Sequence, residues 1–379
     1  MSRLEEYISH VPLVDHHCHG LMPGDLVPAE FETLITESHA EHARSHFDAP
    51  FGLMVLAHCA ELLGLQRHCS PAEYLARRTE LGATEVASRL LRSTGIVTYL
   101  LDTGYQGSAI TSVTEFQGLA KQPCYEIVRL EAVAEQVAPA TTAARFAQDF
   151  REALDHRAKH AHGFKSIVAY RFGLDFNPHP PTEQEVARAA GEWLASCSAS
   201  GRYRLDHETL LRFGLYSAIE YRKPIQLHIG FGDSDIELHR CDPSHLTRFF
   251  RQTESSGANF TLLHCYPFIQ QAGILSHVFP HVWMDIGLTV NYLGPSASRA
   301  MAQALEIAPF GKHLFSSDAF GLPELYACGA HLWRRALTEV LQSWVNADSI
   351  SETDAIRYAE WMARGNAERL YELSEGAKR

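Results

Sequence analysis

The sequence predicts an α/β fold: a distorted (β/α)8 TIM barrel with a helical insertion after strand 1 and extra C-terminal helices. Three observations predict this fold. Short apolar or β-branched runs alternate with stretches of helical periodicity, which is the pattern of parallel βαβ units. Eight such runs follow one another, and eight repeats favour a closed barrel over an open sheet. The length of 379 residues suits one barrel with insertions.

Each predicted strand is a short apolar run bounded by polar or turn-forming residues. The eight runs are residues 11–16, 96–101, 125–130, 164–170, 224–228, 260–264, 282–286 and 313–317. Helical periodicity separates them, as in residues 141–160, 183–198, 208–221 and 298–307. An open doubly wound sheet would need a glycine-rich phosphate-binding turn after its first strand, and residues 18–23 form no such turn.

The segment between the first two strands is too long for one connecting helix. It contains four stretches of helical character, at residues 28–45, 51–63, 71–81 and 84–93. We expect them to form a helical insertion over about 25–95 that covers one mouth of the barrel. After the eighth strand, residues 323–373 predict two or three further helices, the last over 351–373. Because no linker or repeat divides the sequence, we expect a single domain over residues 1–379.

The composition argues against several classes of partner. The formal net charge of -12 disfavours a protein that binds nucleic acid by neutralising phosphates. The first ten residues contain no apolar signal-peptide core, and no later run reaches the about 18 apolar residues that a membrane span needs. The eight scattered cysteines contain no Cys-x-x-Cys pair, so most are expected to be buried free thiols. We expect a cytoplasmic protein with a small-molecule substrate and no nucleic-acid or membrane partner, and a homo-oligomer stays open.

Side chains that bind metals follow four of the predicted strands, at the end where barrel enzymes place their active sites. Strand one ends with His17 and His19, and the strand period of two points both to the same side. Strands five, six and eight are followed by His228, His264 and Asp318. One histidine at a strand end is more often a packed core residue, but five ligand types at one rim predict a metal centre. Imidazole and carboxylate ligands suit Zn²⁺, with Fe²⁺ and Mn²⁺ as alternatives.

The order and spacing of these residues resemble those of the amidohydrolase superfamily over nearly the whole chain. Its members have His-x-His after strand one, Lys or Glu on strand four, His on strands five and six, and Asp after strand eight. Residues 163–171, 228–233 and 264–268 look most like the second amidohydrolase family. They are similar in particular to the amidohydrolase half of nodulin-like glutamine-synthetase fusion proteins.

The resemblance implies one or two divalent metals. It assigns a first metal to His17, His19 and Asp318. In a mononuclear site His228 binds the same metal, and His264 is a catalytic acid or base. In a binuclear site His228 and His264 share a second metal, and a carboxylated Lys165 bridges the two ions, as in dihydropyrimidinases and urease. A free Lys165 outside the ligand set is the alternative.

The resemblance also implies a reaction: hydrolysis of an amide or related C–N bond in a small substrate, with or without a carboxylate group. A metal-activated water attacks, Asp318 moves the proton, and His264 polarises the carbonyl or protonates the departing amine. A metal-dependent non-oxidative decarboxylase on the same barrel is the alternative enzyme. A catalytically inactive binding barrel is disfavoured because none of the five ligands is missing.

Residues next to the strand ends are the candidates for substrate binding. These candidates are Tyr105 after strand two, Glu131 after strand three, and Tyr170 and Arg171 at the end of strand four. Arg171 suits a substrate carboxylate because guanidinium binds it bidentately, and the alternative is a wall arginine paired with an acid. Arg129 and Asp102 lie at the ends of strands three and two. Asp233 and Asp235, in the loop after strand five, are expected to be solvated.

Overall fold

The computed structural model describes residues 2–38 and 45–373. A parallel sheet forms its centre, in which each strand pairs with the next one along the chain. The strands are β1 (Leu13–Cys18), β2 (Ile96–Asp102), β3 (Cys124–Arg129), β4 (Gly163–Ser166), β5 (Ile225–Ile229), β6 (Phe260–His264) and β7 (Val282–Met284). Their order confirms the predicted succession of βαβ units.

An extended segment over residues 313–317 occupies the place of the eighth strand. Leu314 N–H donates to the carbonyl of Met284 after β7 at 3.0 Å, and His16 N–H of β1 donates to the carbonyl of Phe315 at 3.2 Å. The segment therefore hydrogen-bonds to both edges of the sheet. The structure confirms the predicted distorted barrel, with seven regular strands.

The prediction of a regular strand over 313–317 is wrong, and side-chain hydrogen bonds explain why. Ser317 N–H donates to Oδ1 of Asp15 at 3.0 Å instead of to a backbone carbonyl. The next residue, Asp318, has a φ of 48°, which turns the chain out of extended geometry. The predicted strand 164–170 is also too long, because Val168–Arg171 forms the short helix α10.

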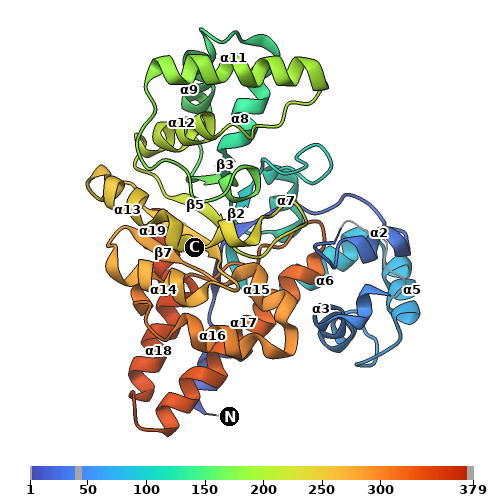
Figure 1. Ribbon diagram of the computed structural model, residues 1–379. Helices are drawn as coiled ribbons and strands as arrows, with labels where there is room; N and C mark the ends of the chain where they lie inside the picture. Colours follow the sequence, from blue (N-terminus) through green and yellow to red (C-terminus); the bar gives the residue numbers. More distant parts are fainter. Residues whose placement is uncertain (1, 39–44, 374–379) are drawn as a thin grey trace.

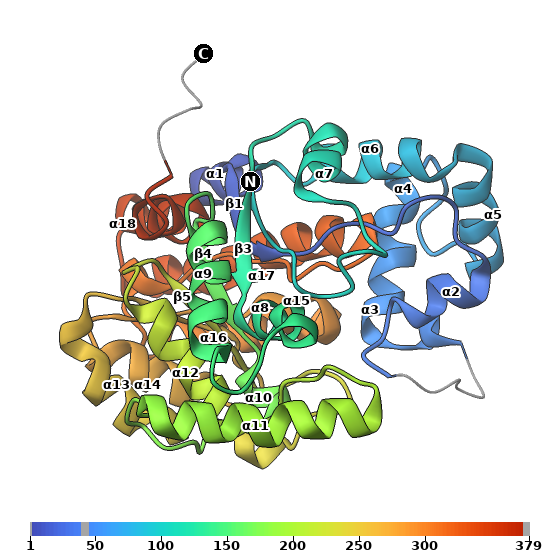
Figure 2. The ribbon, with the colours of Figure 1, turned by 90° about the horizontal axis from the view of Figure 1, so that it is seen from above.

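Helices connect the strands and surround the sheet. Figure 1 shows α8, α9, α11 and α12 gathered on one side of the sheet, and Figure 2 shows the same arrangement from above. The predicted helices 141–160, 183–198, 208–221 and 298–307 correspond to α9, α11, α12 and α16. The connecting helices are α7 (Val113–Ala120), α8 (Leu130–Val137), α9 (Phe146–Ala158), α10, α11 (Glu183–Ser200), α12 (Glu208–Ile219), α13 (Thr247–Thr253), α14 (Ile269–Val278), α15 (Gly287–Leu293) and α16 (Ala297–Ala304).

Single turns of 3-10 or π helix interrupt several connections. The 3-10 turns are His46–Asp48, Ala138–Ala140, Leu238–Cys241, Pro243–Leu246, Glu254–Ser256, Gly294–Ser296 and Phe310–Lys312. The π turns are Val55–Cys59, within the insertion, and Trp361–Gly365, near the C-terminal end of the chain.

The insertion between β1 and β2 is helical, as predicted, but its first helix is short. Its helices are α2 (Pro28–Thr33), α3 (Pro50–Met54), α4 (Ala60–Leu62), α5 (Pro71–Leu81) and α6 (Ala83–Ser93). The predicted helix 28–45 ends at Thr33, where a turn begins with Leu34 N–H bonded to the carbonyl of Phe31. The part of that prediction over 39–44 lies outside the described residues.

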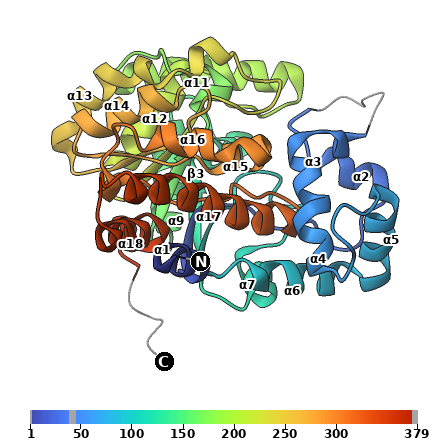
Figure 3. The same cartoon turned by 90° about the horizontal axis from the view of Figure 1, so that it is seen from below.

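The C-terminal helices pack against the insertion and against helices that surround the sheet. They are α17 (Pro323–Asn346), α18 (Glu352–Glu360) and α19 (Asn366–Leu370), and α1 (Arg3–His10) packs on α17 and α18. Figure 3 shows α17 lying between the insertion and the pair α1 and α18. In the described parts of the chain no helix is both long and apolar enough to cross a membrane. All eight cysteines are free thiols and all but Cys69 are buried, as predicted.

Candidate metal centre

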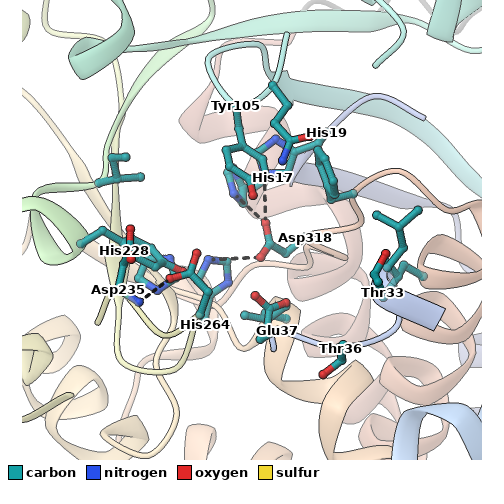
Figure 4. Close-up of a pocket in the computed structure, with 18 of the residues that line it drawn as sticks. His17, His19, Thr33, Thr36, Glu37, Tyr105, His228, Asp235, His264 and Asp318 are labelled. Atoms are coloured by element: carbon teal, nitrogen blue, oxygen red, sulfur yellow. Dashed lines mark hydrogen bonds and ion pairs between the residues drawn. The ribbon is translucent and has the colours of Figure 1, made fainter. Parts of the chain in front are cut away.

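Asp318 lies at the centre of the predicted ligand set, just beyond the extended segment that replaces strand eight. Its Oδ1 is 2.9 Å from Nε2 of His17 and 3.5 Å from Nε2 of His19, both at the end of β1. Its Oδ2 is 3.5 Å from Nε2 of His264, the last residue of β6. Figure 4 shows these side chains converging on the carboxylate. The structure thus brings four predicted ligands from three distant stretches of sequence into direct contact.

His228 of β5 completes the group from the side of His264. Its ring centroid is 4.7 Å from that of His264 and 4.3 Å from that of Tyr170. Nε2 of His228 and Nδ1 of His264 are buried and have no hydrogen-bond partner among the described residues. Because a buried polar atom without a partner is costly, these nitrogens are suited to an additional bound group.

The donor set fits a divalent cation. Ligand atoms of His17, His264 and Asp318 lie within 4.8 Å of one another. Three imidazoles and one carboxylate around one point are a chemical environment that Zn²⁺ and its neighbours prefer. A second group of His17, His19 and Asp102 is equally close, but Asp102 accepts from Arg129 Nη2 at 2.5 Å and from its Nε at 3.0 Å. That ion pair occupies the Asp102 carboxylate, so of the two groups the one around Asp318 is better suited to a cation.

Hydrogen bonds to Nδ1 orient the two histidines of β1. Gln226 Oε1 lies 2.8 Å from Nδ1 of His17, and the carbonyl oxygen of Asp102 lies 3.1 Å from Nδ1 of His19. Both partners accept, so each Nδ1 has the proton and each Nε2 is left with a lone pair. This is the tautomer that a histidine needs to bind a metal through Nε2.

The backbone is strained where two of the side chains enter the site. His264 has a φ of 70° and Asp318 a φ of 48°, values in the left-handed region that non-glycine residues avoid. Asp285, just after β7, accepts the N–H of His264 at 2.7 Å, and the N–H of Asp318 donates to the carbonyl of His17 at 3.1 Å. These hydrogen bonds stabilise the backbone turns at His264 and Asp318, which direct both side chains into the site.

Burial sets the charge of the site. It lowers the pKa of His17 to about 3, with nearby Lys165 adding to the effect, and the pKa of His264 to about 4. Both imidazoles are therefore neutral at pH 7 and available as ligands. Burial alone would raise the pKa of Asp318, but His264 and His17 beside it hold that pKa well below its usual range. Asp318 is therefore an anion.

Lys165 enters the same cluster from β4 and is fully enclosed. Its Nζ lies 3.4 Å from Nε2 of His17. Burial lowers its pKa to about 8, so a substantial fraction of the amine is neutral slightly above pH 7. The structure places Lys165 beside the ligands, where a bridging carbamate or a free amine would both act on the metal.

A cavity of about 510 Å³ opens above these residues. Three predicted substrate-binding residues, Tyr105, Tyr170 and Arg171, line it. Arg171 Nη1 also donates to Glu135 at 2.9 Å, so the arginine has an acidic partner as well as a place on the cavity wall. Asp235, expected to be solvated, lines the cavity too and forms an ion pair with Arg204 at 3.0 Å.

Glu131, the fourth predicted substrate-binding residue, does not line the cavity. Its Oε1 accepts from Ser166 Oγ at 2.6 Å and from Ile167 N–H at 3.0 Å. The reason is its place in the first turn of α8, which directs the side chain against the end of β4. Its carboxylate fixes that strand end, next to Lys165, and is buried there.

Three residues that the sequence did not single out complete the surroundings of the site. Glu37, from the insertion, lines the cavity, and Figure 4 shows it below Asp318 and beside His264. Burial and Asp318 raise its pKa to about 7, and a hydrogen bond joins it to Tyr292. No periodicity predicts Glu37, because it lies in irregular chain after α2.

The other two, Gln226 and Asp285, lie beneath the candidate ligands, and a feature of the sequence could have indicated each of them. Gln226 precedes His228 by two residues, so the period of two places both on one face of β5. Asp285 is a carboxylate inside an otherwise apolar predicted strand, and such a residue is rarely buried without a partner.

Sequence comparisons place the chain among known proteins. Residues 122–373 match the family described as Amidohydrolase. The chain is 31% identical over 224 residues to Protein fluG of Emericella nidulans, a match that covers 56% of this chain and 26% of that protein. The chain therefore corresponds to about a quarter of the length of this curated relative.

Solved structures give the same result. A protein from Lactobacillus casei ATCC 334, provisionally described as a metal-dependent hydrolase, is 27% identical with a TM-score of 0.87 over 98% of both chains. A uronate isomerase from Bacillus halodurans C-125, 12% identical, has a TM-score of 0.65 over 97% of this chain and 95% of its own, and shares the fold. Because the family match covers more than half of the sequence, this chain belongs to the amidohydrolase family.

Proposed function

We propose that this protein is a metal-dependent hydrolase that cleaves an amide or related C–N bond in a small, carboxylate-bearing substrate. The observation that supports it most is the Asp318 carboxylate, which three histidine nitrogens approach within 3.5 Å at the floor of the cavity. Membership of the amidohydrolase family implies a divalent metal, and the ligand set favours Zn²⁺.

We propose that the site holds one metal. His17, His19 and Asp318 would hold it, and His228 with its unpartnered Nε2 would complete the set. Lys165 would remain a free amine beside the site. Elemental analysis of protein purified without chelator tests this: one equivalent agrees with the proposal, and two equivalents with a carboxylated Lys165 contradict it.

The chemistry follows from the charges. A divalent cation held by these residues would supply Lewis-acid chemistry that activates a water as the nucleophile at neutral pH. The Asp318 carboxylate accepts a proton as the water attacks the substrate carbonyl, and then delivers that proton to the leaving nitrogen. His264, neutral and buried, would polarise the carbonyl oxygen by donating a hydrogen bond to it.

The cavity wall would select the substrate. Arg171 is placed to bind a substrate carboxylate, because its guanidinium has further N–H groups beyond the one that contacts Glu135. Tyr105 and Tyr170 would contact the rest of the substrate. Glu37, with a pKa of about 7, is protonated in a large fraction of molecules at neutral pH and can then donate a hydrogen bond to the substrate.

An assay that separates two products tests the reaction. The metal-loaded protein is incubated with a panel of N-acyl amino acids and carboxylated amides, and amine and CO2 are measured separately. Amine release that a chelator abolishes and Zn²⁺ restores is the expected result. CO2 release without amine would replace the proposal with the decarboxylase alternative. Neither product from fully metal-loaded protein on any compound would contradict it.

A further inference from the structure

A chain of buried hydrogen bonds runs beneath the metal centre and reaches the C-terminal end of the described chain. Gln226 Oε1 lies 2.8 Å from Nδ1 of His17, and Gln226 Nε2 lies 2.9 Å from the hydroxyl of Tyr371. Tyr371 directly follows α19, and it is about as deeply buried as the histidine. Tyr371, which is far in sequence from the strands, thus contacts Gln226, the hydrogen-bond partner of His17.

The orientation of the Gln226 amide follows from its neighbours. Its Nε2 lies 2.7 Å from the carbonyl oxygen of His16, which can only accept a hydrogen bond. The NH2 group must therefore face His16 and Tyr371, and the amide oxygen must face His17. Both amide hydrogens and the oxygen are satisfied in this orientation, and a flipped amide would leave the His16 carbonyl against an oxygen.

This orientation determines which nitrogen of His17 has the proton. Because Gln226 presents an oxygen, Nδ1 of His17 is the donor and Nε2 keeps its lone pair. Nε2 is the atom that points to Asp318, at 2.9 Å. Without the Gln226 oxygen, the other tautomer would be equally available, and its Nε2 could not bind a cation.

The same network reaches His264, on the far side of the centre. The Tyr371 hydroxyl is 3.1 Å from Nδ1 of His16, and Nε2 of His16 is 2.7 Å from Oδ2 of Asp285. Oδ1 of Asp285 accepts a hydrogen bond from the backbone N–H of His264 at 2.7 Å. Tyr371 therefore lies between the residues that support His17 and His264.

We propose that Gln226 and Tyr371 are positioning residues, which hold His17 in the tautomer and orientation that bind the metal. The segment after α19 is then part of the metal centre, although it lies outside the cavity. This inference rests on the metal site of the proposed function, but not on the reaction.

Metal affinity is the readout. Metal-free protein is titrated with Co²⁺ in competition with a chromophoric chelator, and the visible Co²⁺ spectrum reports the ligand geometry. Gln226→Met removes the acceptor and is expected to weaken Co²⁺ binding by about 10- to 100-fold, the usual effect of losing a partner of a metal-bound histidine. Gln226→Glu keeps an acceptor for Nδ1, and as the neutral acid that burial favours, its hydroxyl can still donate to the His16 carbonyl, so it should bind at least about tenfold more tightly than Gln226→Met.

Tyr371→Phe removes the hydroxyl that steadies the amide, and a smaller loss of about 3- to 10-fold is expected, with a changed Co²⁺ spectrum. Tyr358→Phe, on α18 and outside the network, is the matched control and should bind like wild type. Thermal unfolding of each metal-free variant shows whether it is folded. If Gln226→Met does not fold, the comparison of Tyr371→Phe with its control Tyr358→Phe tests the inference.

Wild-type affinity and spectrum in folded Gln226→Met, or in Tyr371→Phe if Gln226→Met does not fold, would overturn the inference. These measurements need no substrate. A protein that binds Co²⁺ as expected, but releases no amine in the product assay, would contradict the proposed function and leave the positioning roles intact.

Discussion

The two walls of the cavity are built in different ways. On the barrel side, the candidate histidine ligands stand at or next to strand ends, where pairing between neighbouring strands fixes their positions, as in the pairing of Ile229 with His264. On the insertion side, Glu37 stands in irregular chain after α2, where burial and a hydrogen bond to Tyr292 hold its side chain. Under the proposed function, the barrel would provide the chemistry and the insertion would adjust which substrate meets it.

Buried side chains attach the insertion to the barrel. The rings of Phe31, Phe47 and Tyr74 pack together, with centroids 5.6 to 6.4 Å apart. Arg78 Nε donates to Glu324 at 2.6 Å, and the Tyr74 hydroxyl donates to the same carboxylate at 2.8 Å. Glu324 lies in the first turn of α17, which begins shortly after Asp318. The insertion is therefore anchored to the element that follows the central carboxylate.

The largest effect is expected on the barrel side. Asp318→Asn removes the proton acceptor but leaves the histidine ligands, so turnover should fall by about 10³-fold or more while metal content stays nearly intact. Steady-state kinetics together with elemental analysis measure both. Asp235→Asn, a cavity-wall acid paired with Arg204, is the comparison and should change turnover far less. Full activity in Asp318→Asn would remove this residue from the chemistry.

The attachment of the insertion gives the next largest effect, and it is one of stability. Arg78→Met leaves the buried Glu324 carboxylate without its cation, and the free energy of unfolding should fall by about 3 kcal/mol. Urea denaturation measures it. The double variant Arg78→Met with Glu324→Leu replaces the pair by apolar groups and should recover much of the loss. A single variant as stable as wild type would show that packing alone holds the insertion.

Glu37→Met separates the two walls most directly. Loss of the hydrogen bond that Glu37 donates to the substrate should lower kcat/KM by about 10- to 30-fold, with unchanged metal content, because Glu37 is not among the proposed ligands. Kinetics on the best substrate of the amide panel measure it. Glu61→Met, at an exposed insertion residue paired with Arg67, is the matched control. If Glu37→Met lost metal instead, the insertion would belong to the metal centre, and the comparison would fail.

The same contrast explains how far the sequence predicted the structure. Strand positions followed from apolar runs, and rim residues such as His228 and Asp318 followed from strand ends, because parallel strands share one active edge. The regular eighth strand was wrong because a single side chain, Asp15, takes the backbone N–H of Ser317. Such competition between side chain and backbone has no periodic signature.

Residues placed by tertiary packing were harder to predict. Glu131 stands where the sequence predicted, after strand three, but its rotation within α8 turns it onto Ser166 and away from the cavity. Glu37 reaches the cavity only because α2 ends early. The early end of α2 therefore accounts both for the difference from the predicted helix and for the position of Glu37 at the cavity. No local sequence pattern predicts where α2 ends.

The smallest expected effect concerns acid and the contact between the insertion and α17. The rings of His58, in the insertion, and His331, in α17, stack with centroids 4.0 Å apart and planes at 15°. Burial, with His331 adding to it, lowers the pKa of His58 to about 3, so the folded protein keeps this imidazole neutral. Since the folded pKa lies below the unfolded value of about 6.5, the stability contributed is complete above pH 6.5 and is lost as the pH falls from there toward 3.

Urea denaturation should therefore show a loss of about 1 kcal/mol from His58 between about pH 6.5 and about pH 5.5. His58→Phe keeps a ring in the stack without a titrating group, so its free energy of unfolding should fall less over that interval than that of wild type. His156→Phe, at an exposed position on α9, should leave the wild-type pH dependence unchanged. An equal pH dependence in all three proteins would mean that the loss of stability in acid arises from groups other than His58.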